Sequence, residues 1–382
     1  MSRYRGRRSG GSSRLIPFII ALLGAIAAIV LVIINVTQDK TPADTPVDDD
    51  LQQDVLPPDD TLPDEGDDTT VEDEPQHVVI EVQGDEERYD AVYRVGDTGY
   101  EMYTYVESTA KKYADNINAI ADAVEGTATV YMLPAPLSSG ITLPDALYGK
   151  DIFSDQKAAE DGIIGFMNDN VVSVPLNKAM MAHRGEYIYF RTDHHWTATG
   201  AYYAYAEFCK AAGKTPTPLE SYETEEFPGF LGTFYRDTNE SSHLGDNPDT
   251  VVAYHPLSAD ATLDYTDKNG QVVRWPIIYD QSSAPASYKY GTFVGGDQPY
   301  TNIKNPALTD GSSCVVVKES FGNAFVPFLV DHYETVHVID YRYWEGSVSD
   351  FVKTNGVDDV LFVNNLSAIR SSVLVGYLHD IL

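Results

Sequence analysis

Apolar and polar positions divide the chain into three stretches. Residues 15–36 (LIPFIIALLGAIAAIVLVIINV) carry no charge, residues 37–77 carry few apolar side chains, and residues 78–382 are mixed. About 20 apolar residues suffice to cross a bilayer as a helix, and five arginines among residues 1–14 predict that this end stays in the cytoplasm. We therefore expect a basic cytoplasmic tail at 1–14, a transmembrane anchor at 15–36 and an extracytoplasmic remainder. A cleaved signal peptide is the alternative, but its apolar core would be shorter.

Residues 37–77 form a tract of Pro, Asp, Glu and Thr. Such a composition cannot bury enough apolar surface to offset the entropy of ordering, and like charges and prolines extend a chain. We expect a disordered acidic, Pro-rich linker that holds a folded domain away from the membrane. The formal charge of −32 argues against nucleic-acid binding, because no basic stripe is present to neutralise phosphates. The two cysteines are too few for a disulfide framework, and their apolar surroundings predict buried free thiols.

The folded region, residues 78–382, alternates between helical and strand patterns. The spacing predicts helices over 99–124, 157–170, 197–213, 321–333, 347–355 and 367–382, and strands over 127–136, 171–176, 313–320, 334–344 and 358–365. This alternation predicts a three-layer α/β/α domain with a mainly parallel sheet. Residues from about 215 to 310 break the pattern, with many turn residues followed by segments typical of antiparallel strands. We interpret them as a β-rich insertion in the same domain.

One serine lies where such a sheet would bind a ligand. The buried run CVVVKES ends in Ser320, and a helix is predicted to begin directly after it. Ligands of open α/β sheets bind at the carboxyl ends of the strands, and a helix N-terminus offers free N–H groups to an oxyanion. A strand–Ser–helix junction is the geometry that a nucleophilic serine needs. Ser320 could instead be an ordinary helix N-cap, and there is no G-x-S-x-G elbow.

A serine nucleophile needs a base, and the segment RTDHHW supplies a candidate. In an extended or turn segment, residues i and i+2 share a face, so Asp193 can accept a hydrogen bond from Nδ1–H of His195. Nε2 of His195 is then free to face Ser320. We expect His194 to point the other way and Trp196 to be a packing residue. A buried structural cluster remains the alternative.

A metal site is a further alternative for Asp193, His194 and His195. Adjacent His side chains diverge in a strand, and no H-x-x-x-H, H-E-x-x-H or C-x-x-C completes a ligand set. We therefore expect no metal. We also expect no nucleotide cofactor, because no glycine loop for phosphate is present.

Several of these segments resemble one bacterial family. The stretch RTDHHWTATGAYYAYAEF resembles the signature of the DHHW-motif family, and ESFGNAFVPFLVDHYETVHVIDYRYW is similar to its second signature. Three further segments resemble it less specifically: GDTGYEMYTYVESTAKKYADNINAIA, GTFYR and GGDQPYTNI. The resemblance covers roughly residues 90–382. The family is similar in turn to the SGNH-hydrolase-like domains of alginate O-acetylation proteins.

The resemblance implies a role for each of the three candidate residues. In the alginate O-acetylation domains a D-x-H pair precedes a distant serine, which implies Asp193 as orienting acid, His195 as base and Ser320 as nucleophile. Such proteins transfer or remove acetyl groups on extracytoplasmic polysaccharide, often beside a membrane-bound O-acyltransferase. This sequence departs from the usual SGNH pattern, because its serine block is K-E-S near the C-terminus rather than G-D-S near the N-terminus.

The residues that would complete the site are less well defined by the sequence. The N–H of Ser320 is the first candidate for an oxyanion donor. Asn323 can also donate, and Gly295 and Gly296 would allow close backbone approach. Tyr235 and Arg236 could line a sugar site or belong to an exposed loop. We expect a membrane-anchored acetyltransferase or acetylesterase of cell-envelope polysaccharide. The alternative is a carbohydrate-binding or scaffold module with the same fold.

Overall fold

A computed structural model describes residues 78–382 of the protein. The predicted tail, anchor and linker (1–14, 15–36 and 37–77) lie outside the described residues. Within the described part of the chain, no helix is both long enough and apolar enough to cross a membrane.

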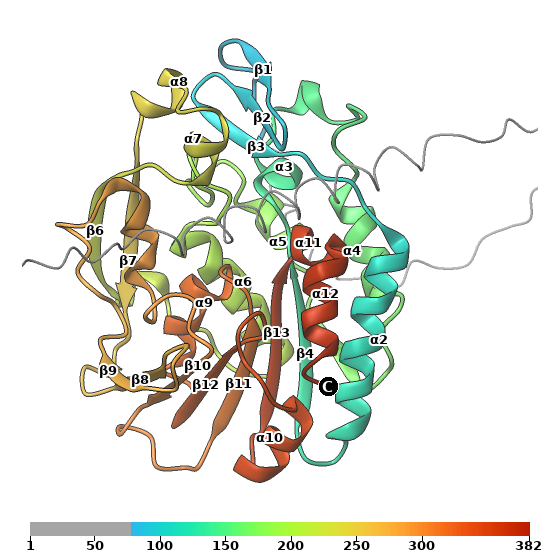
Figure 1. Ribbon diagram of the computed structural model, residues 1–382, viewed down its shortest axis with the longest axis vertical. Helices are drawn as coiled ribbons and strands as arrows, with labels where there is room; N and C mark the ends of the chain where they lie inside the picture. Colours follow the sequence, from blue (N-terminus) through green and yellow to red (C-terminus); the bar gives the residue numbers. More distant parts are fainter. Residues whose placement is uncertain (1–77) are drawn as a thin grey trace, which may run out of the picture. The chain divides into compact units, whose positions relative to one another are not determined.

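A large, mostly parallel sheet organises this mixed α/β fold (Figure 1). Its eight strands run in the order β5-β4-β13-β11-β12-β10-β8-β9. The first five strands in this order are parallel: β5 (Val171–Ser173), β4 (Thr129–Ala135), β13 (Asp359–Asn365), β11 (Ser313–Lys318) and β12 (Thr335–Asp340). Every residue of β11 is buried, as expected for a central parallel strand covered on both faces.

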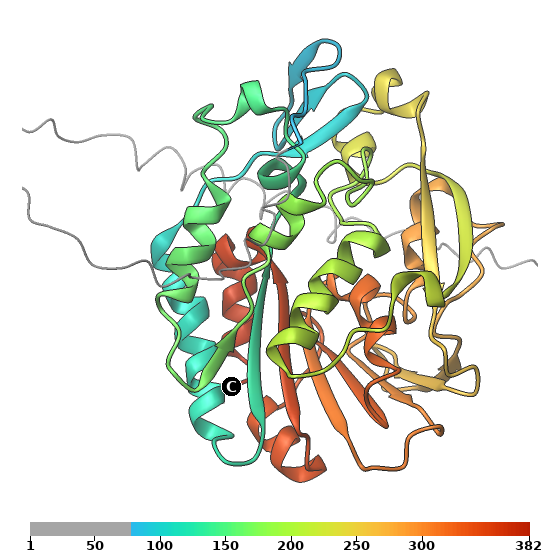
Figure 2. The same cartoon turned by 180° about the vertical axis from the view of Figure 1, so that it is seen from behind.

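Helices cover both faces of the sheet, as predicted. On one face α2 (Glu107–Ala123) packs with α10 (Val348–Asn355), α11 (Leu366–Arg370) and α12 (Ser372–His379) (Figure 1). On the other face α6 (Ala198–Ala211) packs against α9 (Gly322–Leu329), which is clearest from behind (Figure 2). The shorter helices are α3 (Ser138–Ile141), α4 (Gln156–Ile164), α5 (Asn177–Ala182), α7 (Thr233–Asp237) and α8 (Ser242–Gly245). The layered arrangement follows from alternating strand and helix patterns, each of which must bury one apolar face.

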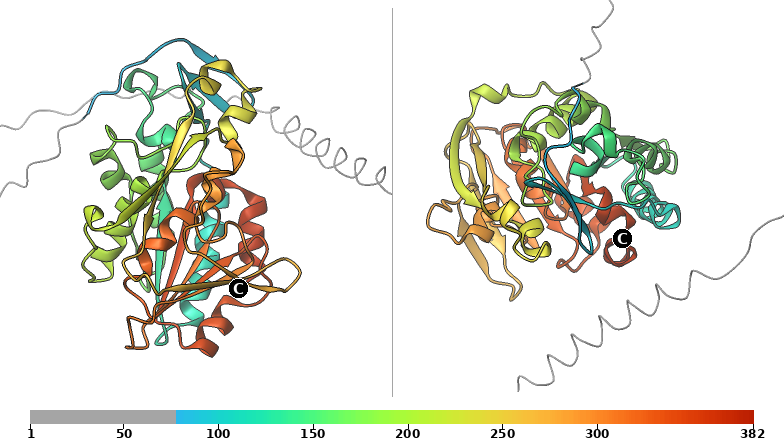
Figure 3. Two further views of the ribbon diagram at one scale, coloured as in Figure 1. Left: turned by 90° about the vertical axis from the view of Figure 1, so that its left-hand side faces the viewer. Right: turned by 90° about the horizontal axis from the view of Figure 1, so that it is seen from above.

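The region 215–310 is rich in strands, which are divided between the main sheet and a separate two-stranded sheet. Three of its strands, β8 (Thr262–Thr266), β9 (Val272–Trp275) and β10 (Tyr300–Lys304), extend the main sheet antiparallel beyond β12. The other two, β6 (Glu223–Phe230) and β7 (Asp249–His255), pair with each other, and β7 packs against α6 (Figure 3). Three short turns of 3-10 helix complete the chain: Asp145–Leu147, Leu219–Ser221 and Ala286–Thr292.

Three predicted helices differ in the structure. The predicted helix 157–170 ends already at Ile164. The predicted helix 99–124 begins only at Glu107, because Thr98–Glu101 forms strand β3 in a small antiparallel sheet with β1 (Glu86–Arg88) and β2 (Val92–Val95). The predicted C-terminal helix 367–382 is two helices. Ser371 has an extended backbone between them, and its hydroxyl accepts a hydrogen bond from Leu374 N–H to cap α12. Both cysteines are free and buried, as predicted.

Candidate active site

The turn after β11 presents Ser320 at the carboxyl ends of the parallel strands. β11 ends at Lys318 and α9 begins at Gly322, so only three residues join them. A Cβ at Gly322 would lie 2.5 Å from Cβ of Lys318, which explains why this sharp turn carries a glycine. The side chain of Ser320 does not cap the helix. Its hydroxyl oxygen lies 2.8 Å from Nε2 of His195 and 3.4 Å from a Glu319 carboxylate oxygen.

The segment before α6 holds the acid and the imidazole. Thr197 caps α6 by accepting from Gly200 N–H at 3.2 Å, and its own hydroxyl donates to the Tyr187 carbonyl at 2.8 Å. The fully buried Trp196 donates from its indole N–H to the Phe321 carbonyl at 2.9 Å. Trp196 therefore packs as predicted. It also connects residues 191–197 to residues 319–321, which are called the acid–base segment and the nucleophile turn after the roles predicted from the sequence.

The three predicted triad residues form one hydrogen-bonded chain. Nδ1 of His195 lies 2.5 Å from Oδ1 of Asp193, and Nε2 lies 2.8 Å from Oγ of Ser320. The His195 ring stacks on Tyr290, with ring centroids 4.0 Å apart, and the Tyr290 hydroxyl donates to the Ser320 carbonyl at 3.0 Å. Tyr290 thus touches both the imidazole and the nucleophile turn, a role that nothing in the sequence around it indicated.

Asp193 is held ionised by its surroundings. Burial raises the pKa of its carboxyl, but the positive charge that His195 and His194 can carry and the hydrogen bonds that it accepts outweigh burial. The pKa therefore falls well below the ordinary value. One of these bonds comes from Thr233 N–H at 2.8 Å, and another from His195 N–H at 3.0 Å. A buried carboxylate in this state can fix the His195 tautomer with the proton on Nδ1.

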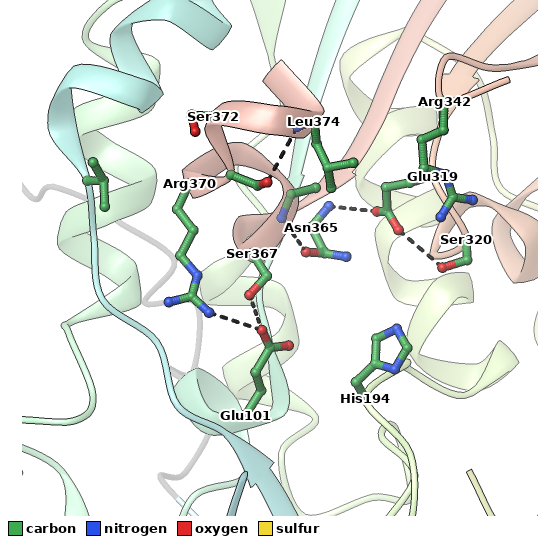
Figure 4. Close-up of a pocket in the computed structure, with 13 residues that line it drawn as sticks. Glu101, His194, Glu319, Ser320, Arg342, Asn365, Ser367, Arg370, Ser372 and Leu374 are labelled. Atoms are coloured by element: carbon green, nitrogen blue, oxygen red, sulfur yellow. Dashed lines mark hydrogen bonds and ion pairs between the residues drawn. The ribbon is translucent and has the colours of Figure 1, made fainter. Parts of the chain in front are cut away.

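The prediction that His194 points away from His195 is wrong. The two rings lie 3.8 Å apart between centroids, because a turn rather than an extended strand carries them. His194 places Nδ1 2.7 Å from the Thr233 hydroxyl, and its ring borders the same cavity as Ser320 (Figure 4). Burial and the neighbouring His195 lower the pKa of His194, which favours its neutral form.

The same correction applies to the geometric argument against a metal. Potential ligand atoms of Asp193, His194 and His195 lie within 4.8 Å of one another, so divergence does not exclude a shared ion. Both Asp193 oxygens and both His195 nitrogens, however, already make hydrogen bonds with protein groups. A cation bound there would have to replace the contact that joins His195 to Asp193 or to Ser320.

The remaining predicted residues fall into two groups. Asn323 lies beside the nucleophile turn: its N–H donates to the Ser320 carbonyl at 3.2 Å, and its side-chain amide donates to Asp297 at 2.9 Å. Gly295 and Gly296 adopt left-handed backbone with φ of 76° and 75°, as turn glycines do, and Gly296 N–H donates to Phe293.

Tyr235 and Arg236 lie on α7. Tyr235 packs on the cluster of Phe234 and Leu244, and the largely exposed Arg236 pairs with Asp237 at 2.7 Å. The structure therefore brings Asn323 to the turn. It does not bring Gly295, Gly296, Tyr235 or Arg236 to the lining of the cavity beside Ser320.

A buried charge network lies behind the nucleophile turn. Nζ of Lys318 is 3.0 Å from Asp340 and 3.3 Å from Asp297, and Arg342 pairs with both carboxylates. Lys318 and Asp340 are almost completely buried. Because Asp297 also accepts from Asn323, the network joins β11, β12 and the start of α9. The lysine of K-E-S is therefore a structural residue directly behind Ser320.

Glu319 is a buried carboxylate next to Ser320, and it lines the same cavity (Figure 4). It accepts from Asn365 N–H at 3.0 Å and from Phe321 N–H at 3.1 Å. Burial raises its pKa, against the opposing influence of Arg342 and these hydrogen bonds. Because Phe321 N–H is taken by Glu319, it is not free to bind an oxyanion.

A cavity of about 620 Å³ opens beside Ser320. Most of its lining residues are polar or charged, and they come from the nucleophile turn, β3, the acid–base segment, and α11 and α12 (Figure 4). The lining residues are Glu101, Val106, His194, Glu319, Ser320, Arg342, Asn365, Ser367, Ala368, Arg370, Ser371, Ser372 and Leu374.

The fold and the site together define a class: a mixed α/β protein with an Asp–His–Ser chain at the ends of its parallel strands. The model of the family described as DHHW protein matches residues 49–339, most of the chain. The chain belongs to the DHHW family, and the predicted resemblance is confirmed. A comparison with curated proteins finds no match.

Three solved structures are similar to the chain to different degrees. A DHHW family protein from Eubacterium siraeum DSM 15702 is 31% identical, with a TM-score of 0.71, over 78% of this chain and 98% of that one. PatB1 from Bacillus cereus, solved with a sulfonyl adduct, is 18% identical, with a TM-score of 0.63, over 76% of this chain and 98% of that one. At this identity the similarity shows the shared fold alone. The O-acetyltransferase domain of Pseudomonas putida AlgJ is 13% identical over 74% and 96%, and its TM-score of 0.41 supports no functional inference.

Proposed function

We propose that this protein is a serine-dependent O-acetyltransferase or acetylesterase of cell-envelope polysaccharide. One observation carries the proposal: hydrogen bonds of 2.5 and 2.8 Å join Asp193, His195 and Ser320, and Ser320 opens into a cavity. The choice of an acetyl group and of a polysaccharide rests on the resemblance of the DHHW family to alginate O-acetylation domains.

The reaction would proceed in two steps. Ser320 Oγ attacks the acetyl carbonyl of a donor ester while His195 Nε2 takes its proton, and the donor oxygen leaves with that proton. Asp193 holds the imidazole in place and stabilises its charged form. An acceptor hydroxyl then attacks the acetyl-serine, gives its proton to His195, and Ser320 Oγ leaves with the proton returned. A sugar hydroxyl makes the protein a transferase, and water makes it an esterase.

We further propose that residues 15–36 anchor the chain in the cell membrane, with the N-terminus in the cytoplasm and the domain outside. The uncharged 22-residue run and the basic tail support this orientation. A membrane-bound O-acyltransferase is the partner that the family resemblance implies as acetyl source. Protease added to intact cells should remove residues 78–382 and spare the N-terminal tail. Protection of the domain would contradict this topology.

The test of the chemistry is ester hydrolysis by the full chain with 4-nitrophenyl acetate, comparing wild type with Ser320→Ala. Loss of a triad nucleophile should lower the rate by several orders of magnitude. The matched control is Ser283→Ala, which removes an exposed hydroxyl and should leave the rate unchanged.

Labelling supplies a second measurement that does not depend on the donor. A sulfonyl fluoride should modify Ser320 in wild type. It should leave residue 320 unmodified in Asp193→Asn and in Ser320→Ala. Equal hydrolysis by wild type and Ser320→Ala, or labelling that ignores Asp193, would contradict the proposal. Activity that is lost on chelation and restored by added Zn²⁺ would favour a metal at Asp193, His194 and His195 instead.

A further inference from the structure

A second imidazole faces the cavity beside the triad. The side chain of His194 is 28% exposed, whereas that of His195 is 8% exposed. His194 lines the cavity together with Ser320, and its ring edge is directed towards Ser320 and Glu319 (Figure 4). A molecule that enters the cavity to reach Ser320 therefore meets His194, which has no part in the hydrogen-bonded chain of the triad.

The hydrogen bonds of His194 leave one nitrogen for a ligand. Nδ1 lies 2.7 Å from the Thr233 hydroxyl and 3.8 Å from Oδ2 of Asp193. A carboxylate at that distance favours a proton on Nδ1, which makes Nε2 the acceptor nitrogen. Among residues 78–382, the hydrogen bond that the His194 ring makes with the protein is the one at Nδ1, and none involves Nε2. His194 thus offers one hydrogen-bond acceptor to the cavity in a neutral ring.

We propose that Nε2 of His194 binds the acyl acceptor, and that the preferred acceptor carries two hydroxyl groups on adjacent carbons. The inference rests on the proposed function and names the acceptor class for the same site. One hydroxyl attacks the acetyl-serine and passes its proton to His195. The other donates a hydrogen bond to His194 without losing its proton. The two ring centroids lie only 3.8 Å apart, so one small acceptor can contact both imidazoles.

The rest of the cavity suits such an acceptor. Across from His194 lie Glu101, Ser367 and Arg370, and Nη2 of Arg370 pairs with Glu101 at 3.3 Å. These groups can accept and donate hydrogen bonds, and no aromatic ring other than His194 is among the lining residues. The cavity therefore recognises hydroxyl groups through hydrogen bonds rather than through ring stacking.

The experiment measures acceptor choice in one reaction mixture. The full chain is given 4-nitrophenyl acetate with equal amounts of ethane-1,2-diol and propane-1,3-diol, and the monoacetates are separated and quantified. Both probes carry two primary hydroxyls, so they differ only in the one methylene that separates the hydroxyls further in the 1,3-diol. Wild type should favour the 1,2-diol about three- to tenfold, the worth of one hydrogen bond. His194→Phe should abolish the preference, and His194→Gln, which retains an acceptor oxygen, should restore part of it.

Three features make the outcome decisive. The product ratio does not depend on how much enzyme is folded, so a partly unstable variant still gives a result. The control His183→Phe changes a histidine that stacks on Tyr203 away from the cavity, and should keep the preference. An equal preference in wild type and His194→Phe, or Ser320-dependent hydrolysis with no transfer to either diol, would overturn the acceptor role and leave the serine chemistry standing. Absence of any Ser320-dependent turnover or labelling would instead overturn the proposed function.

Discussion

Gly232 is the position where the smallest substitution should damage the site most. It precedes α7, with φ −93° and ψ −150°, a backbone that other residues can adopt. A Cβ there would lie 2.2 Å from both Cβ and Oδ2 of Asp193. The cost of Gly232→Ala therefore comes from space and not from backbone strain.

The size of the effect follows from these distances. Carbon atoms in contact are separated by about 3.5–4.0 Å, so Asp193 or the backbone at Gly232 must move by about 1 Å or more. Oδ2 of Asp193 accepts from Thr233 N–H at 2.8 Å, and Oδ1 lies 2.5 Å from His195. A displacement of about 1 Å in a catalytic group can cost about 100-fold in rate. Overpacking of a well-packed site typically costs about 1–3 kcal/mol.

The assay compares Gly232→Ala with Gly376→Ala in 4-nitrophenyl acetate hydrolysis and in urea unfolding. Gly376 lies within α12, and a Cβ there would have no neighbour within 4 Å. Alanine at that helical position should leave the rate unchanged and raise the free energy of unfolding by about 0.5–1 kcal/mol. Gly232→Ala should lower both quantities. A Gly232→Ala variant with wild-type rate and stability would refute the argument that this close approach holds the acid in place.

Two further predictions concern the charges around the site. Because the pKa of Asp193 is depressed in the folded protein, its stabilisation is complete above the unfolded value of about 3.9 and is lost as pH falls towards the folded value. The excess unfolding free energy of wild type over Asp193→Asn should therefore be largest near neutral pH and shrink below about pH 4; a gap that does not change with pH would contradict this. Lys318→Met leaves the buried Asp340 with Arg342 alone and should cost about 3 kcal/mol in urea unfolding. Lys111→Met, which breaks an exposed pair, should change the unfolding free energy little, and equal losses in the two variants would argue against the network.

The pattern of apolar positions predicted most of the central fold. Runs such as CVVVKES and DDVLFVNN are continuous, β-branched and bounded by turns, so they identify buried strands without any knowledge of their partners. The order of the strands in the sheet could not be predicted from the sequence, because strand pairing depends on tertiary contacts. The start of the predicted helix 99–124 was wrong for a related reason: the apolar residues at 99–106 fit a helix as well as a strand, and the pairing of Tyr93 with Tyr100 decides between them.

The site was predictable where chemistry and spacing act locally. Asp193 and His195 lie two residues apart, and Ser320 follows a recognisable strand. Each could therefore be predicted as a site residue from the sequence directly around it. Tyr290 could not, because no motif surrounds it in the region between β9 and β10. Asp297 lies in the segment GGDQPYTNI, whose resemblance to the family assigns no role to that carboxylate. The direction of the His194 side chain was predicted wrongly. In a turn this direction depends on tertiary contacts such as the one with Thr233, which lies 39 residues away in the sequence.

The position of β13 has a consequence for biosynthesis. This strand is the last in the chain, yet it lies between β4 and β11 in the sheet. Until residues 359–365 have been made, β4 can pair only with β5, and β11 can pair only with β12. The two parts of the sheet should therefore join, and any acyl-transfer activity should appear, only after β13 has been made. A chain that stops before β13 should expose two apolar strand edges and be recognised as misfolded.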